Sequence, residues 1–154
     1  MMRFIPATEA VDALHDLLAA YYREGEDADT PQKELDGFIF YLTGLLESRI
    51  LLGDIALDGE TPVGFVLYAL DGGDYPFPEC PELGTIAEIS VTPDRRAHGL
   101  GCELVQRAEN ALRDSCQQMY VCAHASAQSF WEKRGYSPCG RTAANGLPLL
   151  IKAL

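Results

Sequence analysis

The segment Arg96-Ala97-His98-Gly99-Leu100-Gly101 constrains this chain of 154 residues more than any other. An apolar run over 85–91 predicts a strand directly before it, and an amphipathic pattern over 99–116 predicts a helix directly after it. The first N–H groups of a helix lack intrahelical partners and carry partial positive charge, and glycine lets a bulky group approach the backbone closely. A strand, a basic glycine-bearing turn and a helix N-terminus therefore predict a binding site for a phosphorylated cofactor.

Length and composition bound the class of protein. The length predicts one domain, residues 1–154, that is large enough to bury a core. The longest apolar stretch, 38–46, is too short to cross a bilayer, and the N-terminus has no apolar signal region. The five cysteines have no CxxC spacing, and the three histidines are scattered. We therefore expect a cytoplasmic protein with free thiols, no membrane association and no metal site.

The net charge of −11 is distributed unevenly along the chain. Residues 1–84 hold four Lys or Arg and seventeen Asp or Glu, whereas residues 85–154 hold eight and six. The second part suits a phosphorylated cofactor, and the overall acidity argues against nucleic acid as a partner. Two interpretations of the acidic first part stay open: it keeps the surface soluble, or it attracts a cationic substrate.

Periodicity, cap and turn signals predict the element order β-α-α-β-β-β-α-β-α-β-β, which is an α/β sheet of mixed direction. Strands are expected over 3–6, 50–57, 63–70, 85–92, 119–123, 136–141 and 147–154. A first helix is expected with Thr8 as its cap, a second begins at Thr30-Pro31, and two more span 99–116 and 126–134. The connection over 71–83 is rich in Gly, Pro and acidic residues, which predicts that it is mobile or faces the substrate.

This order and this turn resemble the Gcn5-related N-acetyltransferase (GNAT) superfamily. The family signature Arg/Gln-x-x-Gly-x-Gly/Ala is matched at Arg96, Gly99 and Gly101, and residues 91–95 resemble its usual V-x-P-x-x lead-in. A second family motif, Asn-x-x-Ala-x-x-Phe/Leu-Tyr-x-x-x-Gly-Phe, is similar to residues 124–136. The resemblance implies a mixed, mostly antiparallel central sheet with helices on both faces.

The resemblance also implies an N-acetyltransferase. Such an enzyme moves the acetyl group of acetyl-CoA, or the acyl group of another acyl-CoA, to a primary amine of a small molecule or peptide. The amine attacks the thioester directly in a ternary complex, and the enzyme is expected to be a monomer or homodimer. The expected acyl-CoA contacts lie on the fourth strand, on the turn and helix after it, and in the second motif: Ile89, Ser90, Val91, Arg96, Ala97, His98, Gly99, Leu100, Gly101, Cys102 and Trp131.

An amine must lose a proton before it can attack, and a carboxylate is the expected acceptor. Glu88, on the fourth strand just before the bulge that is usual in this family, is the first candidate for that catalytic role. An outward-facing strand glutamate would look the same in the sequence. Glu82 and Asp74, in the connection before that strand, are weaker candidates.

The chain departs from the family pattern at two positions. Trp131 stands where the family usually has a tyrosine that protonates the leaving thiolate, and an indole N–H does not ionise usefully. Tyr136, Tyr120 or water could supply this proton instead. His124 stands where an asparagine often contacts pantetheine, so it is a candidate catalytic acid or base. The missing tyrosine also permits an alternative, which is a non-catalytic acyl-CoA-binding regulatory or interaction module.

Overall fold

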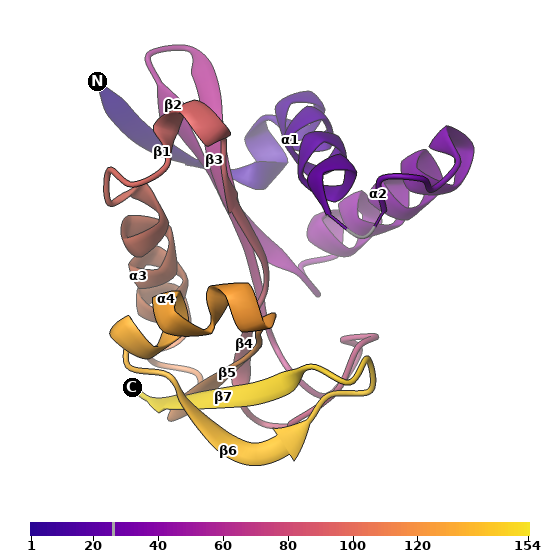
Figure 1. Cartoon of the computed structure of the whole chain (residues 1–154). Helices are drawn as coiled ribbons and strands as arrows, with labels where there is room; N and C mark the ends of the chain where they lie inside the picture. Colours follow the sequence, from indigo (N-terminus) through magenta and orange to yellow (C-terminus); the bar gives the residue numbers. More distant parts are fainter. Residues whose placement is uncertain (26) are drawn as a thin grey trace.

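The computed structural model describes residues 1–25 and 27–154, and its elements follow the predicted order (Figure 1). The strands are β1 (Met2–Pro6), β2 (Leu52–Asp58), β3 (Thr61–Leu70), β4 (Gly84–Val91), β5 (Gln118–Cys122), β6 (Ser137–Thr142) and β7 (Pro148–Ala153). The α-helices are α1 (Val11–Glu24), α2 (Gln32–Glu47), α3 (Leu100–Leu112) and α4 (Gln128–Lys133). Short 3₁₀ turns cover Ala7–Glu9, Pro93–Arg95 and Ala125–Ala127.

The strands form one sheet in the order β1-β2-β3-β4-β5-β7-β6. Within the described sheet β4 and β5 are parallel, and the other paired strands are antiparallel. The parallel pair requires a crossover, which α3 provides. The mixed, mostly antiparallel sheet is therefore confirmed.

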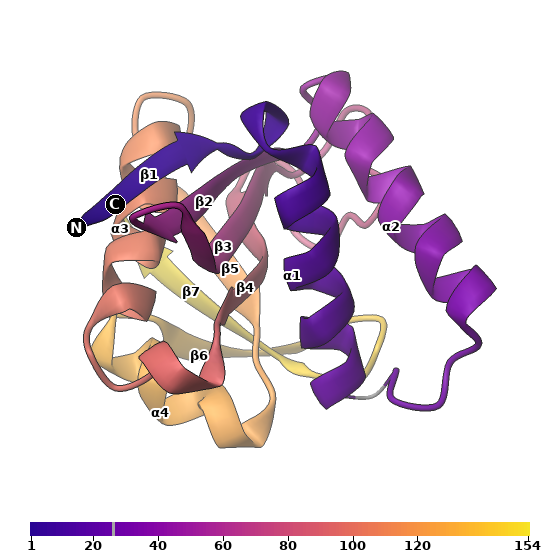
Figure 2. The same cartoon turned by 90° about the horizontal axis from the view of Figure 1, so that it is seen from above.

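Alternation along the central strands sends side chains into two separate cores. On β3, Phe65 and Leu67 join the core under α1 and α2, whereas Val66 and Tyr68 join the core under α3 and α4. Figures 1 and 2 show the two helix pairs on opposite faces of the sheet. Helices on both faces are thus confirmed, and of the described helices none is long and apolar enough to cross a membrane.

Tertiary packing shifts two predicted helix boundaries. Thr8 does not cap a helix: residues 7–9 form a 3₁₀ turn, and α1 begins at Val11. The turn places Ala7, which is fully buried, in the core beneath the first two helices, so packing overrides the local cap signal. The third helix ends at Leu112 rather than near Cys116, and in the turn that follows, the N–H groups of Ser115 and Cys116 both donate to the Leu112 carbonyl.

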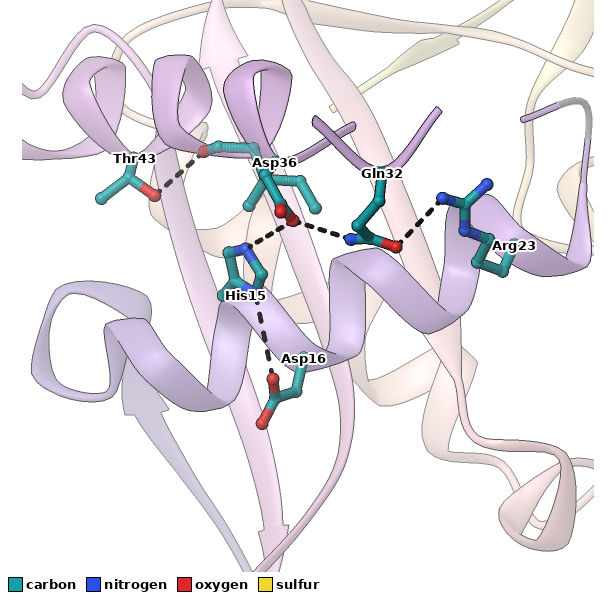
Figure 3. A network of polar contacts seen from close by, with 7 residues as sticks. His15, Asp16, Arg23, Gln32, Asp36 and Thr43 are labelled. Atoms are coloured by element: carbon teal, nitrogen blue, oxygen red, sulfur yellow. Dashed lines mark hydrogen bonds and ion pairs between the residues drawn. The ribbon is translucent and has the colours of Figure 1, made fainter. Parts of the chain in front are cut away.

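A line of polar contacts fixes α2 against α1 (Figure 3). Asp36 accepts a hydrogen bond from Gln32 at 2.8 Å and lies 3.5 Å from His15 Nε2 on α1. Arg23, at the end of α1, donates to Gln32 and to the carbonyls of Asp27, Ala28 and Thr30 at 2.6–3.0 Å. One guanidinium therefore shapes the connection between the two helices.

On the opposite face, a buried charge joins α3 to the end of the sheet. The Glu109 carboxylate, with 6% of its side chain exposed, accepts hydrogen bonds from Lys152 Nζ at 3.0 Å. The Tyr136 hydroxyl donates to the same carboxylate at 2.8 Å. The hydroxyl and the ammonium together satisfy a charge that would otherwise be costly to bury.

Replacing Lys152 by Met should therefore lower the free energy of unfolding by about 3 kcal/mol, because Glu109 stays buried and loses its cationic partner. Urea unfolding measures the loss. Arg3→Met is the matched control: the Arg3–Glu60 pair spans 3.1 Å with side chains 50% and 93% exposed. Its removal should cost less than about 1 kcal/mol. Similar losses in both variants would contradict the importance of burial at Glu109.

Candidate active site

Strand β4 pairs with β3 along its length but with β5 only at its first residues. Leu67 pairs with Glu88 and Tyr68 with Ile86, so Ala87 is the extra residue of a β-bulge. On the other edge, pairing with β5 stops after Thr85 and Tyr120. Beyond that point, β4 pairs with no β5 residue in the described sheet, and this unpaired edge includes Ile89, Ser90 and Val91.

A turn with two left-handed residues connects β4 to α3. Ala97 has φ of 66° and Gly99 has φ of 84°, and Gly99 is the N-cap residue of α3. The first helical hydrogen bond runs from the Glu103 N–H to the Gly99 carbonyl at 3.2 Å. The N–H groups of residues 100–102 therefore come before the intrahelical ladder, which makes this end of the helix suited to an anion. The side chains of residues 96–99 are exposed, including His98.

The two sequence motifs pack directly on each other. A side chain at Gly101 would place its Cβ 3.3 Å from the Phe130 ring, a tight contact that glycine avoids. Phe130 meets Trp131 edge to face at 5.2 Å, and Trp131 meets Tyr136 in the same way at 5.3 Å. Trp131 is 6% exposed and belongs to the core beneath α3 and α4.

Arg96 is engaged by the protein itself. Its Nε donates to the Val91 carbonyl at 2.9 Å, and its terminal nitrogen forms an ion pair with Glu24 at 2.9 Å. These contacts tie the turn to the end of β4 and to the end of α1. Arg96 was predicted to contact acyl-CoA, and the contacts that the structure shows for it lie within the protein and shape the turn.

A cavity of about 1030 Å³ opens beside β4. Its walls come from α1, the connection after it, α2, the connection over 71–83, the diverging ends of β4 and β5, and the turn between β6 and β7. Glu88 and His124, predicted from separate motifs, both line it. The residues predicted to contact acyl-CoA lie outside the lining of this cavity. They lie farther along β4, on the turn after it, at the start of α3 and in the core.

Glu88 is half-buried at the bulge, which it follows rather than precedes, so the predicted order at this point was wrong. The Tyr22 hydroxyl donates to its carboxylate at 3.4 Å. Burial raises the pKa of Glu88 to about 7, hydrogen bonds from Tyr21 and Tyr22 oppose the rise, and the Asp27 carboxylate adds to it. A carboxylate with this pKa can exchange protons near neutral pH.

The other predicted proton carriers lie elsewhere. Glu82 and Asp74 are exposed and do not line the cavity. Tyr136 is buried in the core against Glu109. Tyr120 does line the cavity, but its hydroxyl donates to Asp71 at 2.7 Å, and burial together with that bond raises its pKa far above the usual range.

Asp71 organises the connection between β3 and β4. Its buried carboxylate accepts hydrogen bonds from the N–H groups of Gly72, Glu79 and Cys80 at 2.6–2.7 Å, in addition to the Tyr120 hydroxyl. The segment therefore folds around one carboxylate and presents residues 75–79 to the cavity. Of the two predictions for this segment, the one that it faces a ligand site matches its position.

Sequence reasoning missed the aromatic lining of the cavity. Tyr22, Phe38, Tyr75 and Phe77 all contribute to it, and ring centroids lie 5.7 Å apart in the pairs Tyr22–Phe38 and Tyr75–Phe77. Tyr22 and Phe38 sit on helix stripes that are typical of core packing. The aromatic and proline-rich run over 75–78 was the one local signal that could have been used.

The pKa of Glu88 makes a prediction about stability. Its carboxyl ionises near 4.5 in the unfolded chain and near 7 in the folded protein, so the folded state binds more protons between these values and stability falls as the pH rises through them. Glu88→Gln should therefore raise the free energy of unfolding at about pH 8, by up to about 3 kcal/mol, with the gain vanishing below about pH 4.5. Urea titrations at both pH values measure it. Glu82→Gln, an exposed control, should show no such pH-dependent gain.

Comparisons with known proteins agree with this geometry. The acetyltransferase (GNAT) family matches residues 11–136. The PaiA N-acetyltransferase from Thermoplasma acidophilum, solved with coenzyme A, is similar with a TM-score of 0.73 at 12% identity, covering 100% of this chain and 99% of that one. A GCN5-related N-acetyltransferase from Ralstonia eutropha reaches 0.74 at 23% identity, covering 93% and 97%.

A predicted acetyltransferase from Clostridium acetobutylicum, solved with acetyl-CoA, reaches a TM-score of 0.74 at 16% identity, covering 92% of this chain and 93% of that one. A comparison with curated protein sequences finds no match. The structural likenesses show the fold, and the family match extends over most of the chain, including both motifs. The chain therefore belongs to the acetyltransferase (GNAT) family.

Proposed function

We propose that this protein transfers the acetyl group of acetyl-CoA to a primary amine, by direct attack of the amine on the thioester. The observation that carries the proposal is the position of Glu88. It lies at a bulge where β4 separates from β5 and lines the cavity beside β4, with a pKa of about 7. A proton acceptor is thereby held beside the strand edge along which family members bind their acyl donor.

The donor site is built from backbone groups. The N–H groups at the start of α3 are suited to the pyrophosphate of CoA, and the open edge at Ile89–Val91 is suited to the amide groups of pantetheine. A backbone N–H near Val91 would then stabilise the oxyanion that forms on the thioester carbonyl. Gly99 supports this assignment, because nothing lies within 4 Å of the place that its Cβ would occupy.

The chemistry at the acceptor begins with a proton. A free alkylamine has a pKa near 10, as for lysine, so it reaches the site mostly protonated. Glu88 accepts that proton directly or through water, and the neutral amine forms a C–N bond at the carbonyl carbon. The attacking nitrogen then loses its second proton to water, and the C–S bond breaks to release the CoA thiolate. Holding both partners in one complex lowers the barrier further by removing the entropic cost of their encounter.

The leaving thiolate has less need of help. A thiol with a pKa of about 8.5 leaves tolerably well as an anion, so a tyrosine at position 131 is not essential. Tyr120 and Tyr136 both donate their hydroxyl protons to carboxylates, which makes them poor proton sources. His124, which lines the cavity from the end of β5, is the group that we propose as the proton donor to the thiolate.

Gly99→Glu should weaken CoA binding by more than about tenfold, because a negative side chain would occupy the phosphate position. Calorimetric titration with CoA measures the affinity. Gly140→Glu is the matched control, since Gly140 has φ of 83° and open space around its Cβ position on β6. Both variants carry the same backbone strain, so an equal loss of affinity in both would contradict the assignment of the turn.

Glu88→Gln should lower kcat by about 10²- to 10⁴-fold at neutral pH, and by less at high pH, where the amine is already neutral. The rate of the unaltered enzyme should rise with pH through about 7, as Glu88 loses its proton. Release of free CoA thiol measures the rate across the pH range, and Glu82→Gln should leave the profile unchanged. An unaltered profile in Glu88→Gln would remove this residue from the mechanism.

Absence of thiol release with any amine, together with tight CoA binding, would favour a non-catalytic acyl-CoA-binding module.

A further inference from the structure

The charged groups that line the cavity are all acidic at neutral pH. Asp27, Glu79 and Glu88 come from three separate segments, and among the described residues the lining contains no lysine or arginine. His124 is the one histidine in this described lining. A cavity of this kind favours cations and disfavours anions.

These carboxylates are held by neutral donors. Glu88 accepts from the Tyr22 hydroxyl, Glu79 Oε1 accepts from the Ala144 N–H at 3.0 Å, and Asp27 Oδ1 accepts from the Thr30 hydroxyl at 3.0 Å. Elsewhere in the protein, carboxylates such as Asp54 and Glu24 form ion pairs with arginine. The cavity acids are thus positioned by hydrogen bonds that leave their charge available to a ligand.

Arg141 lies next to Glu79, but it does not bond the Glu79 carboxylate. Its guanidinium donates to the Glu79 backbone carbonyl at 3.1 Å and to the Cys80 sulfur at 3.5 Å. Arg141 does not line the cavity. It therefore fixes the backbone on which Glu79 sits, while the Glu79 carboxylate bonds the β6–β7 turn.

The carboxylates fall into two groups by the contacts that they make. Asp27 and Glu88 interact electrostatically, since the Asp27 carboxylate adds to the effect of burial in raising the pKa of Glu88. Glu79 belongs to the other group: it comes from the 71–83 connection and contacts the β6–β7 turn. The Tyr75 ring stands within electrostatic reach of both groups, since Glu88 and Glu79 each raise the pKa of its hydroxyl, after burial as the main cause.

Aromatic rings line the same cavity as these carboxylates. Tyr75 and Phe77 pack edge to face, and Tyr22 and Phe38 do the same on the helix side. Aromatic faces attract alkylammonium groups and also cover hydrocarbon chains, so they suit a ligand that is cationic at its ends and apolar between them.

We infer that the acceptor is a small alkylamine with a second ammonium group: one amine reacts at Glu88, and the other ammonium is bound by Glu79. This inference rests on the proposed function, and it makes Glu79 a specificity-determining residue. The second amine stays protonated, so its charge contributes to binding throughout the reaction. We infer a small diamine rather than a long peptide, and the Glu79–Ala144 hydrogen bond joins the 71–83 connection to the β6–β7 turn beside the proposed second ammonium site.

The test compares α,ω-alkanediamines with n-alkylamines of the same carbon number as acceptors of the acetyl group from acetyl-CoA. The rate is measured by the release of free CoA thiol. The unaltered enzyme should favour diamines by about tenfold or more in kcat/KM, and added salt should reduce that preference. Glu79→Gln should remove the preference by raising KM for diamines, with a much smaller effect on kcat/KM for monoamines. Glutamine keeps an oxygen for the Ala144 N–H, so the variant preserves the turn.

Two further variants sharpen the result. Glu79→Asp withdraws the carboxylate by one methylene and should shift the best acceptor to a longer diamine. Asp74→Asn changes an exposed acid of the same connection and should change nothing. Equal use of diamines and monoamines, preference for a lysine peptide over every diamine, or an equal effect of Glu79→Gln on both amine series would overturn the inference while leaving amine acetylation intact.

Calorimetry with diamines alone provides a readout that does not depend on turnover. Binding that is lost in Glu79→Gln would support the second cation site even if no acetyl transfer occurred. Acetylation of monoamines without any diamine binding would refute the site and leave the proposed function standing.

Discussion

The parallel pairing of β4 and β5 covers only Gly84–Met119 and Thr85–Tyr120, and the site depends on where that pairing stops. At the last pair, the Thr85 hydroxyl donates to the Tyr120 carbonyl at 3.0 Å, and the Tyr120 hydroxyl donates to the buried Asp71. Gly84 allows the close approach that precedes the separation, since a Cβ there would come within 3.0 Å of Leu112, Cys116 and Met119 atoms. The strands are therefore fixed tightly at one end, and beyond that point they diverge.

Because the strands diverge, the proposed acyl-donor site and the proposed acceptor site lie on different sides of β4 and meet at that strand. The proposed donor site uses the open edge of β4 and the start of α3, which pack on the face that carries α4. The acceptor cavity uses α1, α2 and the 71–83 connection on the other side. The bulge at Ala87 brings Glu88 to the junction, and the Arg96–Glu24 ion pair links the turn after β4 to the end of α1.

Local signals predicted the element order and the motif positions well, because they depend on near neighbours in the chain. Gly99 needs a left-handed conformation at the start of a helix, and a glycine-bearing turn after a strand reveals it. The placement of Glu88 relative to the bulge depended on register with β3, to which no local pattern responds. Asp71 looked like an ordinary loop acid, although its carboxylate receives four hydrogen bonds, because three of its donors come from residues up to 49 positions away.

The replacement of the family tyrosine by Trp131 fits an asymmetry in the proposed reaction. Proton removal is the harder step, because the amine has a pKa near 10 and must be neutral to attack, whereas a thiol with a pKa of about 8.5 can leave as an anion. The half-buried carboxylate of Glu88 is assigned to this harder step, and burial raises its pKa to about 7. Position 131 can then serve packing: Trp131 lies between Phe130 and Tyr136, and Phe130 in turn covers Gly101. The indole thus supports the helix start that we assign to the acyl donor, through contacts that a smaller ring would make less completely.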